Sequence, residues 1–251
     1  MKKIISLLLI LSILSFSAVA YAYTTIEIYI NGVRYEPDVK PFIDASNRTI
    51  VPIRLIAEGL GCKVDWNEKQ QLVTISKGDK VVKLTINKRE ALVNGKTVEM
   101  DTQAVIKDGK RTMVPLRFVS ENMDCTVDFK IEYTTPTIYI KSNDPNLLSV
   151  EHIGFSAFSD NDPTTNGVKY SLGFNVWKQE QVDEAKKLLE KFVKDKDALN
   201  QIYTHIEKKS KDVSFYEAFE TYTFCINGKN YRTKMYITGG NPIISFKAFI
   251  K

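Results

Sequence analysis

Few side chains in this sequence are suited to acid–base or nucleophilic chemistry. The two histidines, His152 and His205, are 53 positions apart, one on an expected strand and one on an expected helix. Either could act with Asp160 or Asp162 to activate water for hydrolysis, since histidine is the commonest general base. The sequence lacks the G-x-S-x-G, H-E-x-x-H, C-x-x-C and phosphate-loop motifs. We predict no catalytic residue and keep a histidine–aspartate hydrolase as an alternative.

The three cysteines do not have the spacing of a metal or redox site. Cys62 and Cys125 are 63 positions apart, at equivalent positions of a repeat described below. One alternative is a disulfide across a pseudo-twofold axis. The other, which we expect, is a pair of small buried thiols. Cys225 lies in an expected strand beside Ile226, in a context that does not suggest a nucleophile.

The loop of residues 160–167 (DNDPTTNG) offers oxygen ligands of the kind that Ca²⁺ prefers. The spacing of an EF-hand fails, because Thr165 stands where glycine is needed and Ser171 where glutamate is needed. We expect an ordinary hairpin loop. We therefore predict no metal site, and we also predict no cofactor.

Residues 1–22 have the pattern of a cleaved secretory signal peptide. Lys2 and Lys3 precede the apolar run Ile4–Ile13, and an Ala-x-Ala sequence ends at Ala22. The alternative is an uncleaved N-terminal anchor, although the run is shorter than the roughly 20 residues that a spanning helix needs. We expect no membrane span after cleavage. The expected location is secreted or extracellular, with association to the cell wall.

One heptad occurs twice. RTIVPIR begins at Arg48 and RTMVPLR begins at Arg111, 63 positions later. So many matches at one offset indicate a duplicated unit, which we place at about 24–86 and 87–141. The same offset aligns further positions: Asn31-Gly32 with Asn94-Gly95, Glu58 with Glu121, Cys62 with Cys125, Val64-Asp65 with Val127-Asp128, and Trp66 with Phe129.

Each unit has the pattern of short antiparallel strands around a short helix. The Asn-Gly pairs predict tight hairpins, and Pro52 and Pro115 suit the first turn of a helix. Gly61 suits a left-handed helix cap, for which Asp124 is less suited. The apolar residues of the two helices recur at i, i+3 and i+7: Ile53, Ile56 and Leu60 in the first unit, and Leu116, Val119 and Met123 in the second.

Each helix also carries an arginine four residues before a glutamate. Arg54 precedes Glu58, and Arg117 precedes Glu121. Such pairs can form ion pairs worth about 0.2–0.5 kcal/mol each. The alternative is that the two arginines clamp an anion. We favour the ion pairs, because residues repeated in both halves of a duplication more often serve the shared fold.

The duplicated pattern, strand–Asn-Gly–strand followed by R-T-x-V-P-x-R-x-[IV]-x-E and V-x-[WF], resembles the copper amine oxidase N-terminal-like domain, also called the stalk domain. The resemblance covers roughly Thr24 to Lys141. It implies a small α+β module of exported bacterial proteins, attached to varied enzymes and unassigned domains, without catalysis by the module itself.

Amine oxidase activity is nevertheless excluded by the residues. Such an oxidase needs three histidines on copper, and this chain has two. It also needs a tyrosine in an Asn-Tyr-acidic motif, whereas Asn230-Tyr231 is followed here by Arg232.

The polar residues 142–149 predict a linker between the duplicated domain, residues 23–141, and a C-terminal domain, residues 150–251. Residues 179–209 have helical spacing, which Asp195-Lys196-Asp197 could interrupt. The expected order is β-β-α-β-β-β, with an antiparallel sheet on a helix, so the fold class is α+β. Two strands alternate, with their apolar residues on one face: Ile153, Phe155 and Ala157, then Val168, Tyr170, Leu172, Phe174 and Val176.

The last strands of the chain are rich in aromatic residues on both faces. One face is expected to pack on the helix; the other is either a contact surface or is covered by a second layer, such as the repeat domain or a dimer mate. The helical segment mixes nine lysines with seven acidic residues between Lys178 and Lys211, which is typical of a solvated face. The aromatic residues are Phe215, Tyr216, Phe219, Tyr222, Phe224, Tyr231, Tyr236, Phe246 and Phe249.

The most consistent interpretation is an exported, non-catalytic protein of the cell surface or cell wall, whose stalk-like module carries a C-terminal binding domain. Its partner would be a wall polymer or an envelope protein. The formal charge of +5, which becomes +3 without Lys2 and Lys3, gives no reason to expect nucleic acid. The alternatives are an envelope-directed hydrolase active in the C-terminal domain, and an extracytoplasmic inhibitor or regulator.

Overall fold

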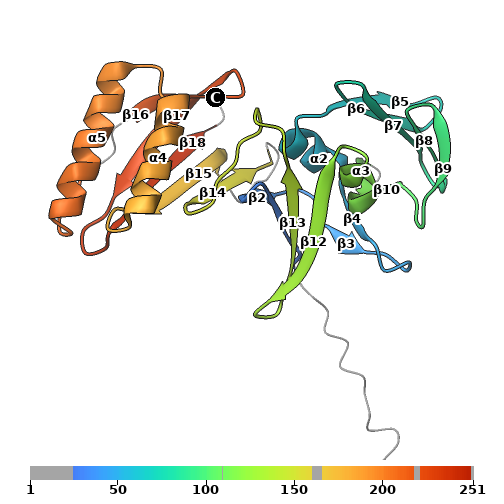
Figure 1. The fold of residues 1–251 in the computed structure, drawn as a ribbon, viewed down its shortest axis with the longest axis horizontal. Coiled ribbons are helices and arrows are strands. Elements are labelled where there is room, and N and C mark those ends of the chain that lie inside the picture. The colour runs from blue at the N-terminus through green and yellow to red at the C-terminus, as the bar shows by residue number, and fades with distance from the viewer. Residues whose placement is uncertain (1–24, 109, 160–165, 218–220, 250–251) are drawn as a thin grey trace, which may run out of the picture.

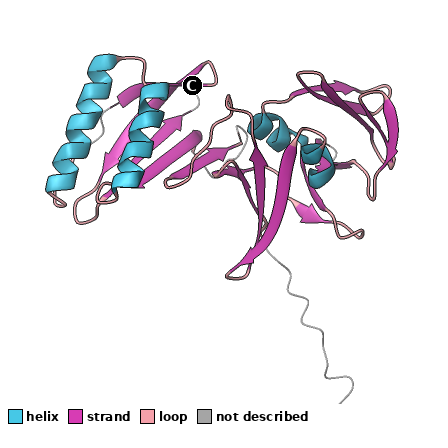
Figure 2. Cartoon of the chain, viewed as in Figure 1, coloured by secondary structure: helices cyan, strands magenta, loops and turns pink. Residues whose placement is uncertain are grey.

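The computed structural model of the protein describes residues 25–108, 110–159, 166–217 and 221–249. The chain is a mixed α/β protein with many strands and few helices (Figure 2). The expected signal peptide, residues 1–22, lies outside the described residues. Among the helices that the structure describes, none is both long enough and apolar enough to cross a membrane.

The duplicated module is built from two units whose elements recur in the same order, except that β7 has no counterpart in the second unit. The first contains β1 (Glu27–Ile30), β2 (Val33–Glu36), β3 (Phe42–Ile43), β4 (Thr49–Pro52), α2 (Ile53–Leu60), β5 (Lys63–Asn67), β6 (Leu72–Lys77) and β7 (Lys80–Thr85). The second contains β8 (Glu90–Val93), β9 (Lys96–Glu99), β10 (Val105–Lys107), β11 (Arg111–Pro115), α3 (Leu116–Glu121), β12 (Cys125–Glu132) and β13 (Thr135–Ser142).

A pseudo-twofold axis relates the two units. It passes through the antiparallel pair β4–β11, where Val51 is the Cα partner of Val114, the same position of the other repeat. Each larger sheet takes strands from both units: β12-β13-β1-β2 adjoin in one, and β5-β6-β7-β8-β9 form the other. The duplication is therefore intertwined, and neither unit completes a sheet alone.

The expected turns and helix ends are largely confirmed. Asn-Gly turns with positive φ join β1 to β2 and β8 to β9, and a third joins two strands of the C-terminal domain. Gly61 caps α2 with φ 64°, and Asp124 adopts φ 58° although aspartate is less suited to it. Pro52 and Pro115 stand one residue before their helices rather than inside the first turn.

The C-terminal domain has two helices where the expected order had one. After β14 (Gly154–Phe158) and β15 (Val168–Asn175) come α4 (Gln179–Phe192) and α5 (Lys196–Lys211), then β16 (Thr221–Ile226), β17 (Lys229–Ile237) and β18 (Ile243–Phe249). The helical segment is broken where the sequence suggested, because the Asp195 side chain accepts hydrogen bonds from the backbone of Asp197 and Ala198 and so caps a new helix. Both helices lie on one face of an antiparallel sheet ordered β14-β15-β18-β17-β16 (Figure 1).

One sheet runs through both parts of the chain. Strand β14 pairs in parallel with β2, which joins the two sets of strands into a single nine-stranded sheet. Two apolar cores flank this junction, and Tyr35 packs against both. The segment between them is anchored: Ser142 N–H donates to Asn31 Oδ1 at 2.8 Å, Lys77 pairs with Asp144 at 2.7 Å, and Val150 N–H donates to Asn31 O at 2.9 Å.

Candidate functional site

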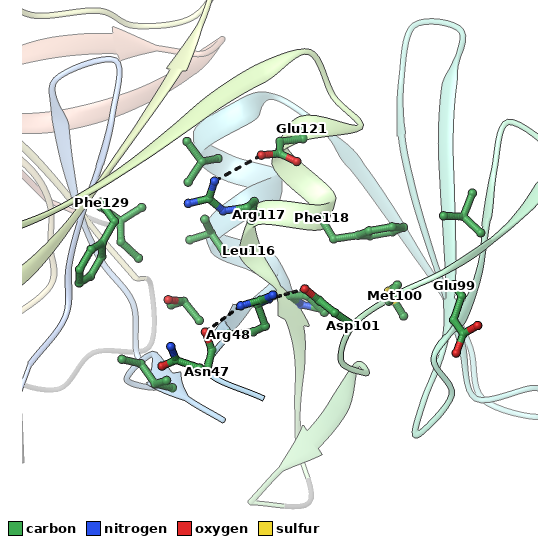
Figure 3. A pocket seen from close by; sticks show the side chains of 16 residues that line it. Asn47, Arg48, Glu99, Met100, Asp101, Leu116, Arg117, Phe118, Glu121 and Phe129 are labelled. Carbon is green, nitrogen blue, oxygen red and sulfur yellow. Dashed lines mark hydrogen bonds and ion pairs between the residues drawn. The ribbon is translucent and has the colours of Figure 1, made fainter. Parts of the chain in front are cut away.

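A groove with a volume of about 730 Å³ lies in the duplicated module. Its floor is α3, one wall is the edge strand β9 and the other is the edge strand β12 (Figure 3). Apolar side chains are unusually open along it: Ile43 is 41% exposed, Val98 39% and Phe129 45%. We call it the second-repeat groove, because most of its lining belongs to the second unit.

Charged residues of the repeated heptads line this groove. The Arg48 guanidinium binds Asp101, and its symmetry-related counterpart Arg111 binds Asp38 at 2.7 Å. Each heptad therefore ties its own unit to the other unit across the pseudo-twofold axis. The carboxylates that bind Arg48 and Arg111 give these two arginines a structural role.

The helix ion pairs expected from the sequence occur in one repeat and not in the other. Arg117 lies 3.7 Å from Glu121, as predicted. Arg54 does not pair with Glu58. Glu58 is bound instead by Lys169 of the C-terminal domain, with Nζ 3.0 Å from Oε2 and the lysine side chain only 6% exposed. The expectation for Arg54 was wrong because a buried ammonium from another part of the chain takes its partner.

The two histidines are placed in different environments, and the structure gives no contact between them. His152 is exposed just before β14, beside Glu151. His205 is buried on α5, where Nδ1 lies 2.6 Å from Gln201 O and Nε2 lies 2.7 Å from a carboxylate oxygen of Glu217. Both ring nitrogens face acceptors, which suits a histidine that joins α5 to the following segment rather than a general base.

The acidic partners proposed for a hydrolase, Asp160 and Asp162, lie outside the described residues, as does most of the calcium-like loop. Among the residues that are described, no cluster of three or more histidine, cysteine, aspartate or glutamate side chains is arranged for a metal ion.

The cysteines are free thiols in this structure. Cys125 is buried and Cys62 is partly buried, close to the pair of buried thiols that the sequence predicted. Burial raises the pKa of the Cys62 thiol to about 11 and also raises the pKa of Cys125. A raised pKa lowers the fraction of reactive thiolate, so neither side chain is tuned for nucleophilic chemistry.

The C-terminal sheet has a second face, turned away from α4 and α5, which we call the outer face. Alternation along β17 and β18 places Arg232, Lys234, Tyr236, Lys247 and Phe249 on it. Aromatic and basic side chains adjoin there: Lys247 Nζ is 5.3 Å from the Tyr236 ring centre, and Lys234 Nζ is 5.8 Å from that of Phe249. None of the described residues in β14 to β18 is acidic.

The predicted aromatic residues occur on both faces of the sheet. Phe215, which we expected in a strand, precedes β16 and packs against the core under the helices, beside His205. Tyr222, Phe224, Tyr231 and Phe246 are buried under the helices, whereas Tyr236 and Phe249 are partly exposed on the outer face. Tyr216 is 64% exposed outside the strands. Phe219 lies outside the described residues.

Two functional features escaped sequence reasoning. The first is Lys169, whose role depends on a partner 111 positions away. The second is the second-repeat groove, whose walls come from strands that are distant in sequence. A signal for the groove was present, because the 63-residue offset also aligns Glu36 with Glu99 and Asp38 with Asp101.

The described chain is a mixed α/β protein in which one sheet takes strands from both the repeated part and the C-terminal part. Residues 29–140 match the family described as the copper amine oxidase N-terminal domain. This match confirms the resemblance drawn from the repeated heptads and covers nearly the whole of the duplicated module. A match to that N-terminal domain is consistent with a module that carries no catalytic site of its own.

Proposed function

We propose that the protein is an exported, non-catalytic binding protein of the cell surface or cell wall. The duplicated module acts as a stalk that holds the C-terminal domain in a fixed orientation. The outer face of the C-terminal sheet binds an anionic polymer of the envelope.

The basic and aromatic side chains of the outer face are the main support for this proposal. Arg232 and Lys247 are exposed there, and Lys234 is the Cα partner of Lys247 on the neighbouring strand. Cations on a flat surface attract a polyanion over a range of about 10 Å at 0.1 M salt. Interleaved aromatic rings add apolar contact and cation–π stabilisation, as is common in polymer-binding surfaces.

The middle of the outer face is suited to a chain lying across it. Small residues alternate onto it from the neighbouring strands: Ser171 and Gly173 of β15, and Ser245 of β18, with Gly173 directly opposite Ser245. These small side chains adjoin the basic and aromatic residues of β17 and β18. A linear polymer could rest on them without displacing any element of the fold.

The shared sheet supports the stalk role. Because β14 pairs with β2 and Lys169 pairs with Glu58, movement between the two parts would break backbone hydrogen bonds and a partly buried ion pair. A stalk with this junction would set the direction in which the outer face points.

The test uses residues 23–251 and purified cell walls, before and after hydrofluoric acid has removed their phosphodiester polymers. The fraction of protein that sediments with the walls is measured for the unaltered chain and for the double variant Arg232→Glu/Lys247→Glu. The matched control is Lys187→Glu/Lys191→Glu, an equal change of charge on exposed positions of α4.

We expect the unaltered chain and the control to sediment with untreated walls, and the outer-face variant to bind about tenfold more weakly. Acid-treated walls are expected to retain little protein. Equal retention of all three proteins, or undiminished binding to treated walls, would contradict a polyanion-binding outer face. Release of wall fragments by the unaltered chain would instead support the hydrolase.

A further inference from the structure

The two repeats contain corresponding grooves, of which one is open and the other is filled. The groove of the second repeat is open, whereas its counterpart in the first repeat has a volume of only about 20 Å³. Eight lining positions of the first-repeat groove recur at an offset of 63 in the second. They are Tyr35, Glu36, Pro37, Asp38, Pro52, Arg54, Leu55 and Glu58 in the first, and Val98, Glu99, Met100, Asp101, Pro115, Arg117, Phe118 and Glu121 in the second.

A strand of the same chain fills the first-repeat groove. The remaining lining residues there are Ala157, Phe158 and Ser159, from β14 and the residue after it. Strand β14 runs parallel to β2, with Ala157 opposite Tyr35, and Ser159 N–H donates to Glu36 O at 2.9 Å. The groove therefore accepts an extended polypeptide that adds a strand to the edge of β2.

Strand β9 is the counterpart of β2, and its edge is open. Its four residues are all exposed, and it is the last strand of the five-stranded sheet. It lies at the outer end of the module, far from the C-terminal domain (Figure 1). In the β8–β9 hairpin, Val93 and Lys96 flank the two-residue turn and form a hydrogen-bonded pair. Because hydrogen-bonded and non-hydrogen-bonded pairs alternate along antiparallel strands, the backbone N–H and C=O groups of Thr97 and Glu99 point away from β8. Glu99 thus presents the same carbonyl that Glu36 uses to bind Ser159.

The floor of the open groove is also ready for apolar side chains. Leu55 on α2 is 4% exposed beneath β14, whereas its counterpart Phe118 on α3 remains partly exposed. Phe118 and Phe129 both face the open space (Figure 3). An incoming strand would cover these rings as β14 covers Leu55.

The charges of the groove favour a basic occupant. In the first repeat Glu58 is satisfied by Lys169 of the inserted domain. In the second repeat Glu99, Asp101 and Glu121 outnumber Arg48 and Arg117, and Glu121 is bound by the exposed Arg117 at 3.7 Å. A lysine or arginine beside the docked strand would occupy the position that Lys169 takes in the first repeat.

We propose that the second-repeat groove is a docking site for an extended segment of a partner polypeptide. The segment pairs in parallel with β9, places small and aromatic side chains on α3 and carries a basic residue toward Glu121. Such edge-strand addition is an established mode of peptide recognition. A second copy of this chain fits less well, because edges paired about a twofold axis run antiparallel, unlike β14 on β2.

The test uses residues 23–251 and a fluorescein-labelled peptide with the sequence of residues 152–159, HIGFSAFS. Binding is followed by fluorescence anisotropy up to about 1 mM peptide. Two further peptides replace both end residues with lysine or with glutamate. The groove variant is Thr97→Pro, which removes an N–H from the open edge of β9. The control is Ile131→Pro on β12, an edge position that is 55% exposed and outside the groove lining.

We expect saturable binding to the unaltered chain and to Ile131→Pro, tighter for the lysine peptide than for the glutamate peptide. Thr97→Pro should bind about tenfold more weakly with an unchanged urea midpoint. Absence of binding, or equal binding to Thr97→Pro, would overturn the proposal. A dimer of the unaltered chain that Thr97→Pro converts to monomer would overturn it too, in favour of a second copy.

Discussion

Lys169 of the C-terminal domain binds Glu58 of the first repeat at 3.0 Å, whereas Glu121, at the same position of the second repeat, is bound by Arg117 of its own helix at 3.7 Å. The two repeats thus carry a glutamate at the same position, and the glutamate of the first repeat is bound by the C-terminal domain. This asymmetry recurs in the strands, the turns and the grooves of the two repeats.

The Glu58–Lys169 pair should contribute more to stability than its counterpart. Glu58→Gln removes a carboxylate that binds the buried Lys169 ammonium, and we expect a loss of about 1–3 kcal/mol in the free energy of unfolding. Glu121→Gln breaks an exposed pair and should change it by less than about 1 kcal/mol. Urea unfolding of both variants checks this, and equal losses would show that the interdomain pair is not special.

The two Asn-Gly turns give a second matched comparison. A Cβ atom added at Gly32 would lie 1.8 Å from Val150 O. A Cβ atom added at Gly95 would have no other atom within 4 Å. Both glycines have positive φ, so Gly95→Ala should cost about 1–2 kcal/mol from backbone strain alone. Gly32→Ala should cost clearly more, because it also displaces the segment that leads into β14.

Thermal and urea denaturation of the two glycine variants measure this difference. Similar losses for Gly32→Ala and Gly95→Ala would mean that residue 150 does not pack against the first turn. A two-step transition for Gly32→Ala alone would show that the junction has been uncoupled while both cores remain folded.

A buried lysine near the C-terminal end of α5 donates hydrogen bonds to three backbone carbonyls. Lys209 is fully buried, and its Nζ donates to Val213 O at 2.5 Å, Phe215 O at 2.9 Å and Thr238 O at 2.6 Å. Lys209→Met would leave three carbonyls without this donor, and we expect a loss of about 2–4 kcal/mol. Lys211→Met, on the exposed side of the same turn, should stay within about 0.5 kcal/mol of the unaltered chain.

The thiol of Cys62 should show its raised pKa in solution. With a pKa of about 11 in place of 9.0, its thiolate fraction at pH 8 is about 100-fold lower than that of an ordinary cysteine. Iodoacetamide labelling of Cys62, in a Cys125→Ser/Cys225→Ser background, should be correspondingly slow and should keep rising beyond pH 10. A rate that levels off near pH 9 would contradict a buried thiol.

The same shift has a consequence for stability. The unfolded chain releases the Cys62 proton near pH 9 and the folded chain only near pH 11, so the folded state binds more protons in between. The free energy of unfolding should therefore fall between these two pH values, more steeply than in Cys62→Ser. When the unaltered chain is unfolded in denaturant without reductant, three cysteine thiols should react with a thiol reagent, since none of its cysteines is bridged.

Sequence reasoning identified features that depend on local chemistry. The Asn-Gly hairpins, the left-handed cap at Gly61 and the helix break at Asp195 follow from residues that stabilise one backbone conformation, and all three are present. The duplication was visible because both units kept the residues that their shared fold needs.

Features that depend on contacts between distant segments were not predicted. The pairing of β14 with β2 joins residues 122 positions apart, and nothing in either strand's alternation specifies its neighbour. For the same reason the expected Arg54–Glu58 pair was wrong. Helix spacing places these two side chains within reach of each other, but the Glu58 carboxylate binds Lys169 of the C-terminal domain instead. The outer face was expected to be either a contact surface or a covered face, and neither alternative included its basic character, which depends on β17 and β18 lying side by side.

The most direct test of this account is amide hydrogen exchange at β9 in the chain of residues 23–251, with and without the lysine-ended peptide. We predict that exchange at Thr97 and Glu99 slows when the peptide is added, because their backbone groups face the open edge, while exchange in β12 and in the first repeat stays the same. Slowed exchange in β12 without any change in β9, or no change anywhere, would contradict the claim that the second repeat keeps open a strand site that the first repeat fills with β14.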